Sequence, residues 1–461
     1  MVRAPHVRDD TIVATATAPG LGAVALVRVS GSLVEQICSR VVSPEPDWPL
    51  RPRRATRCRI HAPDDAVAVL DEGLITFFPS PHSYTGEHVV ELGTHGGAYV
   101  PQAVCAALVE AGARPAEPGE FTERAVLNGK LDLLRAEAVA DLIEARSRAM
   151  HRAAIRQLSG ALSRRLVKLR ETVIEIEALI AYDIDFPEED NGQLPRARIL
   201  DVCDWLIAQV DMLLATVPSA ILGREGATVV LAGAPNTGKS SLLNALAGEA
   251  RVIVSDIPGT TRDAVEVLLE HDPWPIRLVD TAGLRDGADS VERLGIEVSE
   301  RYLSRAHVVI VCAESADALQ RAAKAVRAWT QAPIVGAFTK VDLISRTVET
   351  SAVPFPVAQV SAVRGDGLHT LLAYVTTAIA GTGGVADPDT PVITRARHRA
   401  ALTRAREELV AFRQLWAACA LPAPVVAVHV RAAGAFLDEL IGVVDVEDVF
   451  TRVFSTFCIG K

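Results

Sequence analysis

The chain has 461 residues, of which 49% are hydrophobic and 23% are charged, and its net charge is −10. This length is enough for about three domains of ordinary size, and the composition is that of a soluble protein. The acidic balance excludes a general nucleic-acid coat, so any RNA contact must come from local basic surface. No apolar run could span a bilayer and no signal core follows the N-terminus, which predicts a cytoplasmic protein without membrane contact. The seven cysteines lack CxxC spacing and favour a reducing compartment over a disulfide framework or a zinc site.

The first part of the chain, residues 1–124, mixes short β-rich runs with helical stretches. Ala23–Val27 and Val89–Leu92 have the residue types of strands, and glycines punctuate the segment. We therefore predict an α+β domain here.

The next region, residues 125–223, has apolar residues at helical spacing. They form two runs: Leu131, Leu134, Ala138, Leu142 and Ala145, then Ile155, Leu158, Leu162, Leu166, Leu169, Val173 and Ile176. An acidic turn at 187–192 interrupts the pattern, and the chain becomes helical again in residues 384–461. Both regions are predicted to be helical.

Between them, residues 224–383 alternate apolar β-type runs with helical stretches. The predicted strands are Val229–Ala232, Ile276–Val279, Val308–Val311 and Ile334–Phe338. Continuous apolar strands between helices predict a mostly parallel, doubly wound sheet. Because domain termini tend to lie close together, the economical arrangement is an α/β domain inserted into one discontinuous helical domain.

Two stretches of the helical regions are locally basic. They contain Arg146, Arg148, Arg152, Arg156, Arg164, Arg165, Lys168 and Arg170, then Arg395, Arg397, His398, Arg399, Arg404 and Arg406. Taken alone, both are best interpreted as solvated helix faces.

Residues 233–240, Gly-Ala-Pro-Asn-Thr-Gly-Lys-Ser, match the Walker A pattern between an apolar strand and a good helix start. The glycines let backbone N–H groups converge on phosphate oxygens, and the helix N-terminus adds its positive dipole. In this pattern Lys239 reaches the β and γ phosphates and the Ser240 hydroxyl binds Mg²⁺. The motif in this context predicts a nucleotide site.

A second strand ends at residues 280–283, Asp-Thr-Ala-Gly. Asp280 has the position of a Walker B acid, which holds Mg²⁺ through water, and the amide of Gly283 can meet a γ-phosphate. These four residues alone are modest evidence for a nucleotide site, but their distance downstream of the phosphate loop makes the evidence strong.

A third strand ends at residues 339–342, Thr-Lys-Val-Asp, in the place of the guanine-reading NKxD motif. The Asp342 carboxylate can accept both N–H groups of the guanine edge, which adenine does not offer, and Lys340 can lie along the base. Ser361 and Ala362 complete the base pocket. Thr339 replaces the usual Asn and is shorter, so we expect one contact to the base or phosphate loop to be lost and GTP to bind more weakly.

The usual catalytic parts are missing from this pattern. Leu284 stands where Ras-type GTPases have the Gln that orients water, and the sequence identifies no arginine finger. Thr261, in the run Gly259–Asp263, is assigned to Mg²⁺. Asn236, together with carbonyl groups of Ser255–Thr260, could enclose a K⁺ ion that supplies the missing positive charge.

Several runs resemble the MnmE (TrmE) family of tRNA-modification GTPases. They are residues 233–241, 259–263, 280–285 and 291–293, Thr11–Ala14, Tyr84–Glu87, His95–Gly97, Pro118–Phe121 and the terminal Phe457-Cys458-Ile459-Gly460-Lys461. The resemblance covers essentially the whole chain, and generic GTPases lack the terminal CIGK. It implies a multidomain α/β plus α protein. Residues 1–124 would be an N-terminal α+β folate-binding and dimerisation domain, residues 125–223 and 384–461 a discontinuous helical domain, and residues 224–383 an inserted Ras-like P-loop GTPase domain.

The resemblance also implies a homodimer whose G domains meet across the nucleotide in a K⁺-dependent way. The implied K⁺ ligands are Asn236, Ser255, Ile257 and Thr260, and the implied Mg²⁺ ligands are Ser240 and Thr261. The expected nucleotide-binding positions are Asn236, Thr237, Gly238, Lys239, Ser240, Ser241, Ser255, Asp256, Ile257, Pro258, Gly259, Thr260, Thr261, Asp280, Thr281, Ala282, Gly283, Thr339, Lys340, Asp342, Ser361 and Ala362. Glu292 would position water and Lys239 would act in catalysis, while Cys458 could be catalytic or merely packed.

A folate site is implied at Arg28, Glu91, Lys130 and Lys461. A buried carboxylate such as Glu91 can read a pterin edge, and Arg28 or Lys130 can pair with the glutamate tail of 5-formyl- or methylene-tetrahydrofolate. The implied task is to install a carboxymethylaminomethyl or aminomethyl group at C5 of the wobble uridine of certain tRNAs. The one-carbon unit comes from the folate, and a flavin-dependent partner, MnmG, takes part.

Two alternatives come from other classes. A GTP-switched ribosome-assembly factor would share the G domain, but such proteins usually append a KH domain with a GxxG loop, and only helical patterns follow residue 380. A P-loop ATPase is disfavoured by Asp342.

Overall fold

The computed structural model describes residues 10–45, 48–63, 65–145, 147–185, 196–218, 222–223, 226–249, 252–253, 265–280, 302–343, 353–383, 392–419, 421–442, 453–454, 457 and 460. The chain forms two compact units. One comprises Met1–Ala140, Leu158–Arg170 and Gly434–Lys461, and the other comprises Asp141–Gln157 and Glu171–Ala433.

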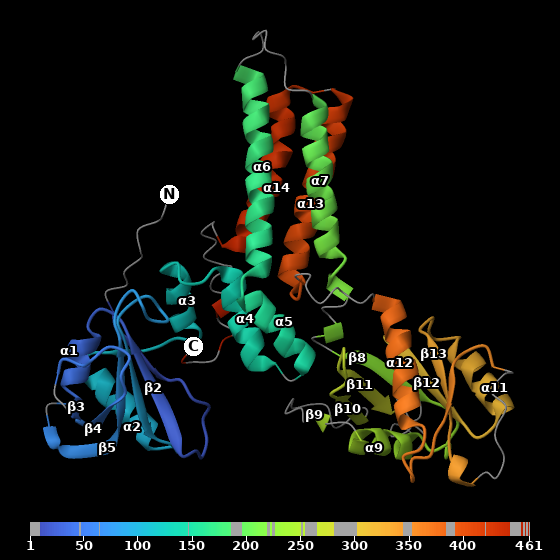
Figure 1. Ribbon diagram of the computed structural model, residues 1–461, viewed down its shortest axis with the longest axis horizontal. Coiled ribbons are helices and arrows are strands. Elements are labelled where there is room, and N and C mark those ends of the chain that lie inside the picture. The colour runs from blue at the N-terminus through green and yellow to red at the C-terminus, as the bar shows by residue number, and fades with distance from the viewer. Residues whose placement is uncertain are drawn as a thin grey trace, which may run out of the picture. The chain divides into compact units, whose positions relative to one another are not determined.

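The first unit contains a seven-stranded sheet in the order β3-β4-β5-β6-β2-β1-β7 (Figure 1). Its strands are β1 Ile12–Thr15, β2 Val24–Ser30, β3 Val42–Glu45, β4 Thr56–Ala62, β5 Asp65–Phe78, β6 Val89–His95 and β7 Arg114–Pro115. Neighbouring strands are antiparallel except for β1 and β7. With helices α1 (Val34–Ser39) and α2 (Val100–Glu110), this is the predicted α+β domain, and both predicted strands are present as β2 and β6.

One face of this sheet forms the core of the unit. Alternate residues of β2, such as Val27 and Val29, pack with Val104 and Leu108 of α2, and all four are buried. The period-2 alternation of a strand leaves the other residues, among them Arg28, on the opposite face.

A buried ionic network joins helix α3 (Glu120–Leu127) to the chain just before β1. The Arg124 guanidinium is 2% exposed and donates to the Glu120 and Asp10 carboxylates at 2.8 and 2.9 Å. It also pairs with Glu87, and Arg114 reaches Glu120 at 2.6 Å. Because burying charges is costly unless they are paired, this network makes the attachment of α3 specific and strongly dependent on each partner.

The network also shifts the titration of Glu120. Burial alone would raise the pKa of this carboxyl, but hydrogen bonds from Arg114, from the amide of Glu117 and from Arg124 hold it below its usual value. A lowered folded-state pKa gives stability that is present above the unfolded pKa and is lost as the pH falls through the folded value.

The regions predicted to be helical, 125–223 and 384–461, contain long helices among the described residues. They are α4 Leu133–Glu144, α5 Arg148–Leu158, α6 Ala161–Asp185, α7 Arg196–Leu214, α13 Ala396–Ala418 and α14 Ala423–Ile441. The second apolar run, Ile155–Ile176, is divided between α5 and α6, because Gly160 adopts a left-handed φ of 80° that interrupts the helix. The predicted acidic turn at 187–192 lies outside the described residues.

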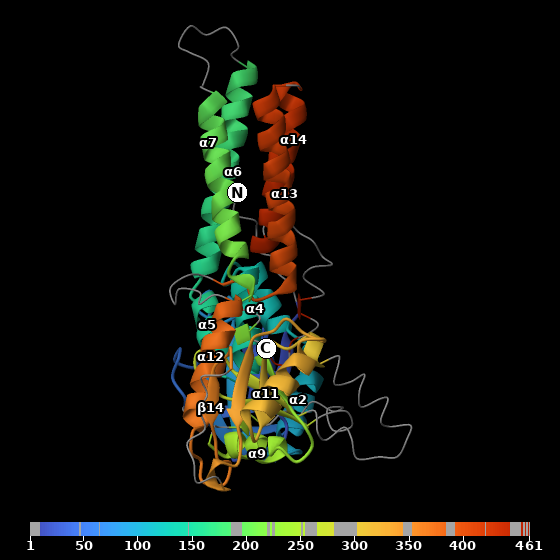
Figure 2. The same ribbon diagram turned by 90° about the vertical axis from the view of Figure 1, so that its right-hand side faces the viewer.

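Within the second unit, α7 and α13 run beside the adjoining lengths of α6 and α14 as a four-helix bundle (Figures 1 and 2). Buried Leu206 and Val210 of α7 and Leu409 and Phe412 of α13 supply the apolar residues expected at such an interface. Ion pairs also join the two helices, from Arg406 to Asp211 and from Arg413 to Asp204. Both regions predicted to be helical are therefore confirmed.

The second unit also holds a seven-stranded sheet in the order β14-β13-β12-β8-β11-β10-β9. Its strands are β8 Ala227–Ala232, β9 Val252–Ile253, β10 Val265–Leu269, β11 Ile276–Asp280, β12 Val308–Ala313, β13 Ile334–Phe338 and β14 Val357–Gln359. From β14 to β11 the neighbours are parallel, whereas β10 pairs antiparallel with β11 and β9. The predicted mostly parallel sheet is confirmed, as are its four predicted strands.

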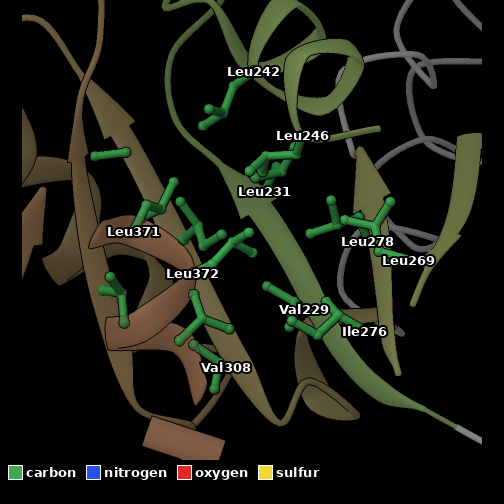
Figure 3. Close-up of a cluster of buried hydrophobic side chains, with 14 of the residues drawn as sticks. Val229, Leu231, Leu242, Leu246, Leu269, Ile276, Leu278, Val308, Leu371 and Leu372 are labelled. Carbon is green, nitrogen blue, oxygen red and sulfur yellow. The ribbon is translucent and has the colours of Figure 1, made fainter. Parts of the chain in front are cut away.

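Helices cover both faces of this sheet. Helices α9 (Lys239–Glu249) and α12 (Leu368–Gly383) place leucines against one face, where Val229 and Leu231 of β8 lie (Figure 3). Val230, on the other face of β8, belongs to a second core with α11 (Ala316–Val326). The carboxyl ends of five parallel strands are thereby held at one edge of the sheet, which is where such folds bind ligands.

Among the described residues, no helix has the length and apolar character needed to cross a membrane.

We expect Arg124→Met to lower the free energy of unfolding of the first unit by about 3 kcal/mol, because a buried carboxylate loses a partner. Arg57→Met is the matched control: the Arg57–Glu72 pair is exposed, so its loss should cost far less than the loss of the buried Arg124 network. Hydrogen exchange of amides in β1 and α3 of the full chain measures both losses. The difference in the free energy of unfolding between the two variants should shrink as the pH falls below about 4.5, the usual pKa of Glu, because protonation of Glu120 removes the charge that Arg124 pairs with. Equal losses at neutral pH would contradict this account.

Candidate functional site

The phosphate loop connects β8 to α9 at the carboxyl edge of the second sheet. Gly233 follows β8 with a φ of 147°, and a Cβ atom there would lie 2.4 Å from the Cys312 carbonyl oxygen of β12. Gly238 has a φ of 83°, and the helix begins at the next residue. Both glycines of the motif are therefore required by conformation, and the first also by its close approach to β12.

Lys239 lies against the loop that precedes it. Its side chain is buried, and its ammonium donates hydrogen bonds to the carbonyls of Gly233 and Ala234 at 3.0 and 2.8 Å. The Thr237 hydroxyl donates to the Ala234 carbonyl at 2.8 Å. A buried positive charge is thus held beside the loop amides, as phosphate binding requires.

The next helix residue meets the end of a neighbouring strand. The Ser240 hydroxyl donates to Oδ2 of Asp280, the last residue of β11, at 2.6 Å. Asp280 is buried. A hydroxyl and a carboxylate oxygen beside a phosphate loop are ligands that suit Mg²⁺, so the residues present fit this metal.

Residues after β13 hold the phosphate loop from the other side. The Thr339 hydroxyl is buried and donates to the Thr237 carbonyl at 2.7 Å. Lys340 has a left-handed φ of 62°, and its ammonium donates to the Asn236 carbonyl at 2.8 Å. Asn236 itself has a φ of 63°. Thr339 therefore keeps a contact with the loop, although it is shorter than the asparagine that the motif usually has.

The carboxylate expected to read the base is also positioned. The Ser361 hydroxyl, which is buried after β14, donates to Oδ1 of Asp342 at 2.7 Å. This hydrogen bond holds the pKa of Asp342 below its usual value, so the side chain is an anion at neutral pH. Ala362 follows directly and is half-buried.

The expected folate residues lie in the first unit, where β2 and β6 pair. Arg28 is directly opposite Glu91 in the register, and its guanidinium donates twice to Oε1 of Glu91 at 2.8 and 3.0 Å. The guanidinium carbon lies 5.5 and 5.7 Å from the ring centres of Tyr84 and Phe121. Two of the four expected residues, Arg28 and Glu91, therefore form an ion pair. A third, Lys130, is exposed, and its ammonium donates to the carbonyl of Pro81 at 3.0 Å.

The C-terminal segment contacts the same region. Arg28 also donates to the Gly460 carbonyl at 3.4 Å. Gly460 has a φ of 96°, and a Cβ atom there would lie 2.4 Å from the carbonyl oxygen of Thr15. The conformation of this terminal glycine and its close approach to β1 account for its place in the motif.

Many expected site residues lie outside the described residues. They are Ser255, Asp256, Ile257, Pro258, Gly259, Thr260, Thr261, Thr281, Ala282, Gly283, Glu292, Cys458 and Lys461, together with Leu284. The structure describes the expected positions Asn236, Thr237, Gly238, Lys239, Ser240, Ser241, Asp280, Thr339, Lys340, Asp342, Ser361 and Ala362, and the contacts above join most of these.

Sequence reasoning did not assign Tyr84, Phe121 or Glu314 to a site. Tyr84 and Phe121 occur in runs quoted only for a resemblance, and nothing local marks them as neighbours of Arg28. Glu314 directly follows β12, and its carboxylate accepts from Lys340 at 2.6 Å. Its place at the carboxyl end of a parallel strand is a signal that could have identified it.

A phosphate loop, a hydroxyl–carboxylate pair for Mg²⁺ and a positioned carboxylate at the base pocket, all on a doubly wound sheet, define the class of P-loop GTPases. Comparison with known proteins narrows the class. The family model "GTP-binding protein TrmE N-terminus" matches residues 11–130, and the model "MnmE helical domain" matches residues 133–458.

Relatives match over almost their whole length. The tRNA modification GTPase MnmE of Moorella thermoacetica is 41% identical over 466 residues, which cover 98% of this chain and 100% of that protein. The proteins of the same name from Azoarcus sp. and Aquifex aeolicus are 41% and 37% identical, over 98% of this chain and 98% and 100% of theirs. The chain belongs to the MnmE (TrmE) family of tRNA modification GTPases, and it is a GTP hydrolase that serves tRNA modification.

Proposed function

We propose that this chain is a K⁺-activated GTPase of the cytoplasm. With the flavin-dependent partner MnmG, it installs a carboxymethylaminomethyl or aminomethyl group at C5 of the wobble uridine, using a one-carbon unit from tetrahydrofolate. The main observation that supports this proposal is that one chain contains two groups of hydrogen-bonded polar side chains. One is the nucleotide site at Ser240 and Asp280, and the other is the Arg28–Glu91 pair beside two aromatic rings.

The domain arrangement we propose for this function has the G domain at 224–383, between the helical segments 125–223 and 384–461. The described strands β8–β14 all lie within 224–383, and long helices precede and follow them. Residues 1–124 would form the folate-binding and dimerisation domain, which contains the whole first sheet.

In the nucleotide site, we assign the phosphates to the loop amides and Lys239, and the guanine edge to Asp342. Bound Mg²⁺ would neutralise charge that develops on the phosphate oxygens, and Ser240 is positioned to ligate it, with Thr261 as the second ligand. Asp280 accepts the Ser240 hydrogen bond and so orients the hydroxyl oxygen. Glu292 is assigned to positioning the attacking water.

The K⁺ site is proposed at Asn236, Ser255, Ile257 and Thr260, and in a homodimer the G domains would meet across it. The Asn236 carbonyl of the backbone already accepts from Lys340, so we assign the K⁺ contact to its side-chain oxygen. The left-handed φ of Asn236 gives this residue a fixed backbone conformation in the loop, which orients that side chain.

We expect GTP turnover to be at least about tenfold faster in KCl than in NaCl at equal ionic strength, because K⁺ supplies positive charge in the transition state. Asn236→Ala should remove this difference, whereas Asn244→Ala, at an exposed position of α9, should keep it. Turnover per chain should also rise with protein concentration if activation needs a dimer. Equal rates in the two salts would contradict the K⁺ mechanism.

The folate site is proposed at Arg28, Glu91, Lys130 and Lys461. Both hydrogen bonds from Arg28 are made to Oε1 of Glu91, so we assign Oε2 to the N–H groups of the pterin. The rings of Tyr84 and Phe121 supply flat apolar surface, and Lys130 supplies positive charge for the glutamate tail. Arg28 thereby acts as a positioning residue for Glu91.

We expect 5-formyltetrahydrofolate to bind the full chain, and Glu91→Gln to weaken this binding by about tenfold or more, because a hydrogen bond to a charged group contributes about 1.5–3 kcal/mol. Glu72→Gln is the matched control, since Glu72 also pairs with arginine but lies on the exposed part of β5. Isothermal titration calorimetry measures both. A wild-type chain that does not bind the folate, or equal losses in both variants, would count against the site.

tRNA contact is proposed for part of the basic surface only. Arg395 and Arg406 pair with Asp141 and Asp211, and Arg170 pairs with Asp438, so these side chains serve the helical packing. Exposed Arg399 of α13 is a candidate for phosphate contact. Titration with tRNA at several salt concentrations checks this, because electrostatic binding must weaken as salt rises.

A further inference from the structure

We propose that Glu314 is a positioning residue for guanine recognition, which it serves by holding the Lys340 ammonium beside the phosphate loop. This inference rests on the proposed nucleotide site. The chemical class of ligand that it would favour is a purine nucleotide whose base lies along the stem of Lys340.

The contact follows from the topology of the second sheet. Strands β12 and β13 are parallel neighbours, and Ala313 is in register with Phe338. Glu314 and Thr339 are the next residues of the two strands, so the carboxylate and the ammonium of Lys340 meet at the carboxyl edge. The two groups are 2.6 Å apart.

The ammonium has a second partner in the phosphate loop. Besides Glu314, it donates to the Asn236 carbonyl at 2.8 Å. The backbone of Lys340 has a left-handed φ of 62°. One lysine therefore connects the end of β12 to the loop that binds the phosphates, and its long stem is restrained at both the backbone and the ammonium.

The substitution at Thr339 makes this restraint more important. A threonine hydroxyl has a single O–H donor, and here it is directed at the Thr237 carbonyl at 2.7 Å. It therefore has no second donor to offer the base, unlike the two N–H groups of an asparagine amide. Recognition of the base then depends on Asp342 at its edge and on Lys340 along its plane.

The Glu314–Lys340 pair is not a stabiliser of the fold. The side chains are 51% and 39% exposed, and exposed ion pairs contribute little to stability. The ion pair instead increases nucleotide affinity, because a lysine that is already fixed loses less conformational entropy when the nucleotide binds.

The test is the dissociation constant of the full chain for GDP and for IDP, which lacks the 2-amino group. Glu314→Gln should raise both constants three- to tenfold and by the same factor, because Lys340 contacts the plane of the base and not that edge. Glu314→Asp should restore part of the affinity. Asp317→Asn, an exposed acid three residues further on, is the matched control and should bind as the wild type does. In a Lys340→Met background, Glu314→Gln should have no further effect.

Unchanged GDP affinity in Glu314→Gln, or an equal loss in the Lys340→Met background, would overturn the role of Glu314. Asp342→Asn separates this failure from that of the nucleotide site, because it should shift preference from guanine to xanthine nucleotides. If the wild type does not bind GDP, or Asp342→Asn does not shift the nucleotide preference, the assignment of the base-binding residues is wrong, and the role of Glu314 is contradicted as well. If the wild type binds GDP and Asp342→Asn shifts the preference, the GDP affinity of Glu314→Gln determines whether Glu314 has the proposed role.

Discussion

The nucleotide site depends on the attachment of the phosphate loop to the strand ends beside it. The shape of the loop is held by side-chain hydrogen bonds to the loop carbonyls and by close backbone approach. Gly233 packs against the Cys312 carbonyl of β12, and Thr339 and Lys340, just after β13, donate to the carbonyls of Thr237 and Asn236. The strand end that holds the phosphate loop also leads into Asp342, so the loop and the proposed base-reading carboxylate are structurally coupled.

The same principle orders the first unit, where charge is held between strands instead of at strand ends. The register of β2 and β6 sets Arg28 opposite Glu91, and the buried Arg124 network fixes α3, which carries Phe121. In both units a buried or half-buried cation is paired with protein oxygens. These hydrogen bonds offset the cost of removing the charges from water, and they would lower the entropy lost if the proposed ligands bind.

The sequence allowed the phosphate loop to be predicted because its geometry is encoded locally, by glycines with positive φ values that other residues rarely adopt and by a helix start at Lys239. The parallel strands were predictable from their continuous apolar runs. The ion pairs were not, because Arg28 and Glu91, or Glu314 and Lys340, meet only through strand pairing between distant segments. The effect of Thr339 was predicted only in part: its shortness suggested a lost contact, but the hydroxyl reaches the Thr237 carbonyl.

The Thr339 hydroxyl holds the phosphate loop through its hydrogen bond to the Thr237 carbonyl, and we claim that nucleotide affinity depends on this bond. The most direct measurement compares GDP affinity in Thr339→Val, which keeps the shape and removes the hydroxyl, with Thr339→Ser, which keeps the hydroxyl. We predict a loss of about tenfold for the valine variant, since the half-buried Thr237 carbonyl loses its donor, and a much smaller loss for the serine variant. Wild-type affinity in Thr339→Val, or equal losses in the two variants, would contradict the claim.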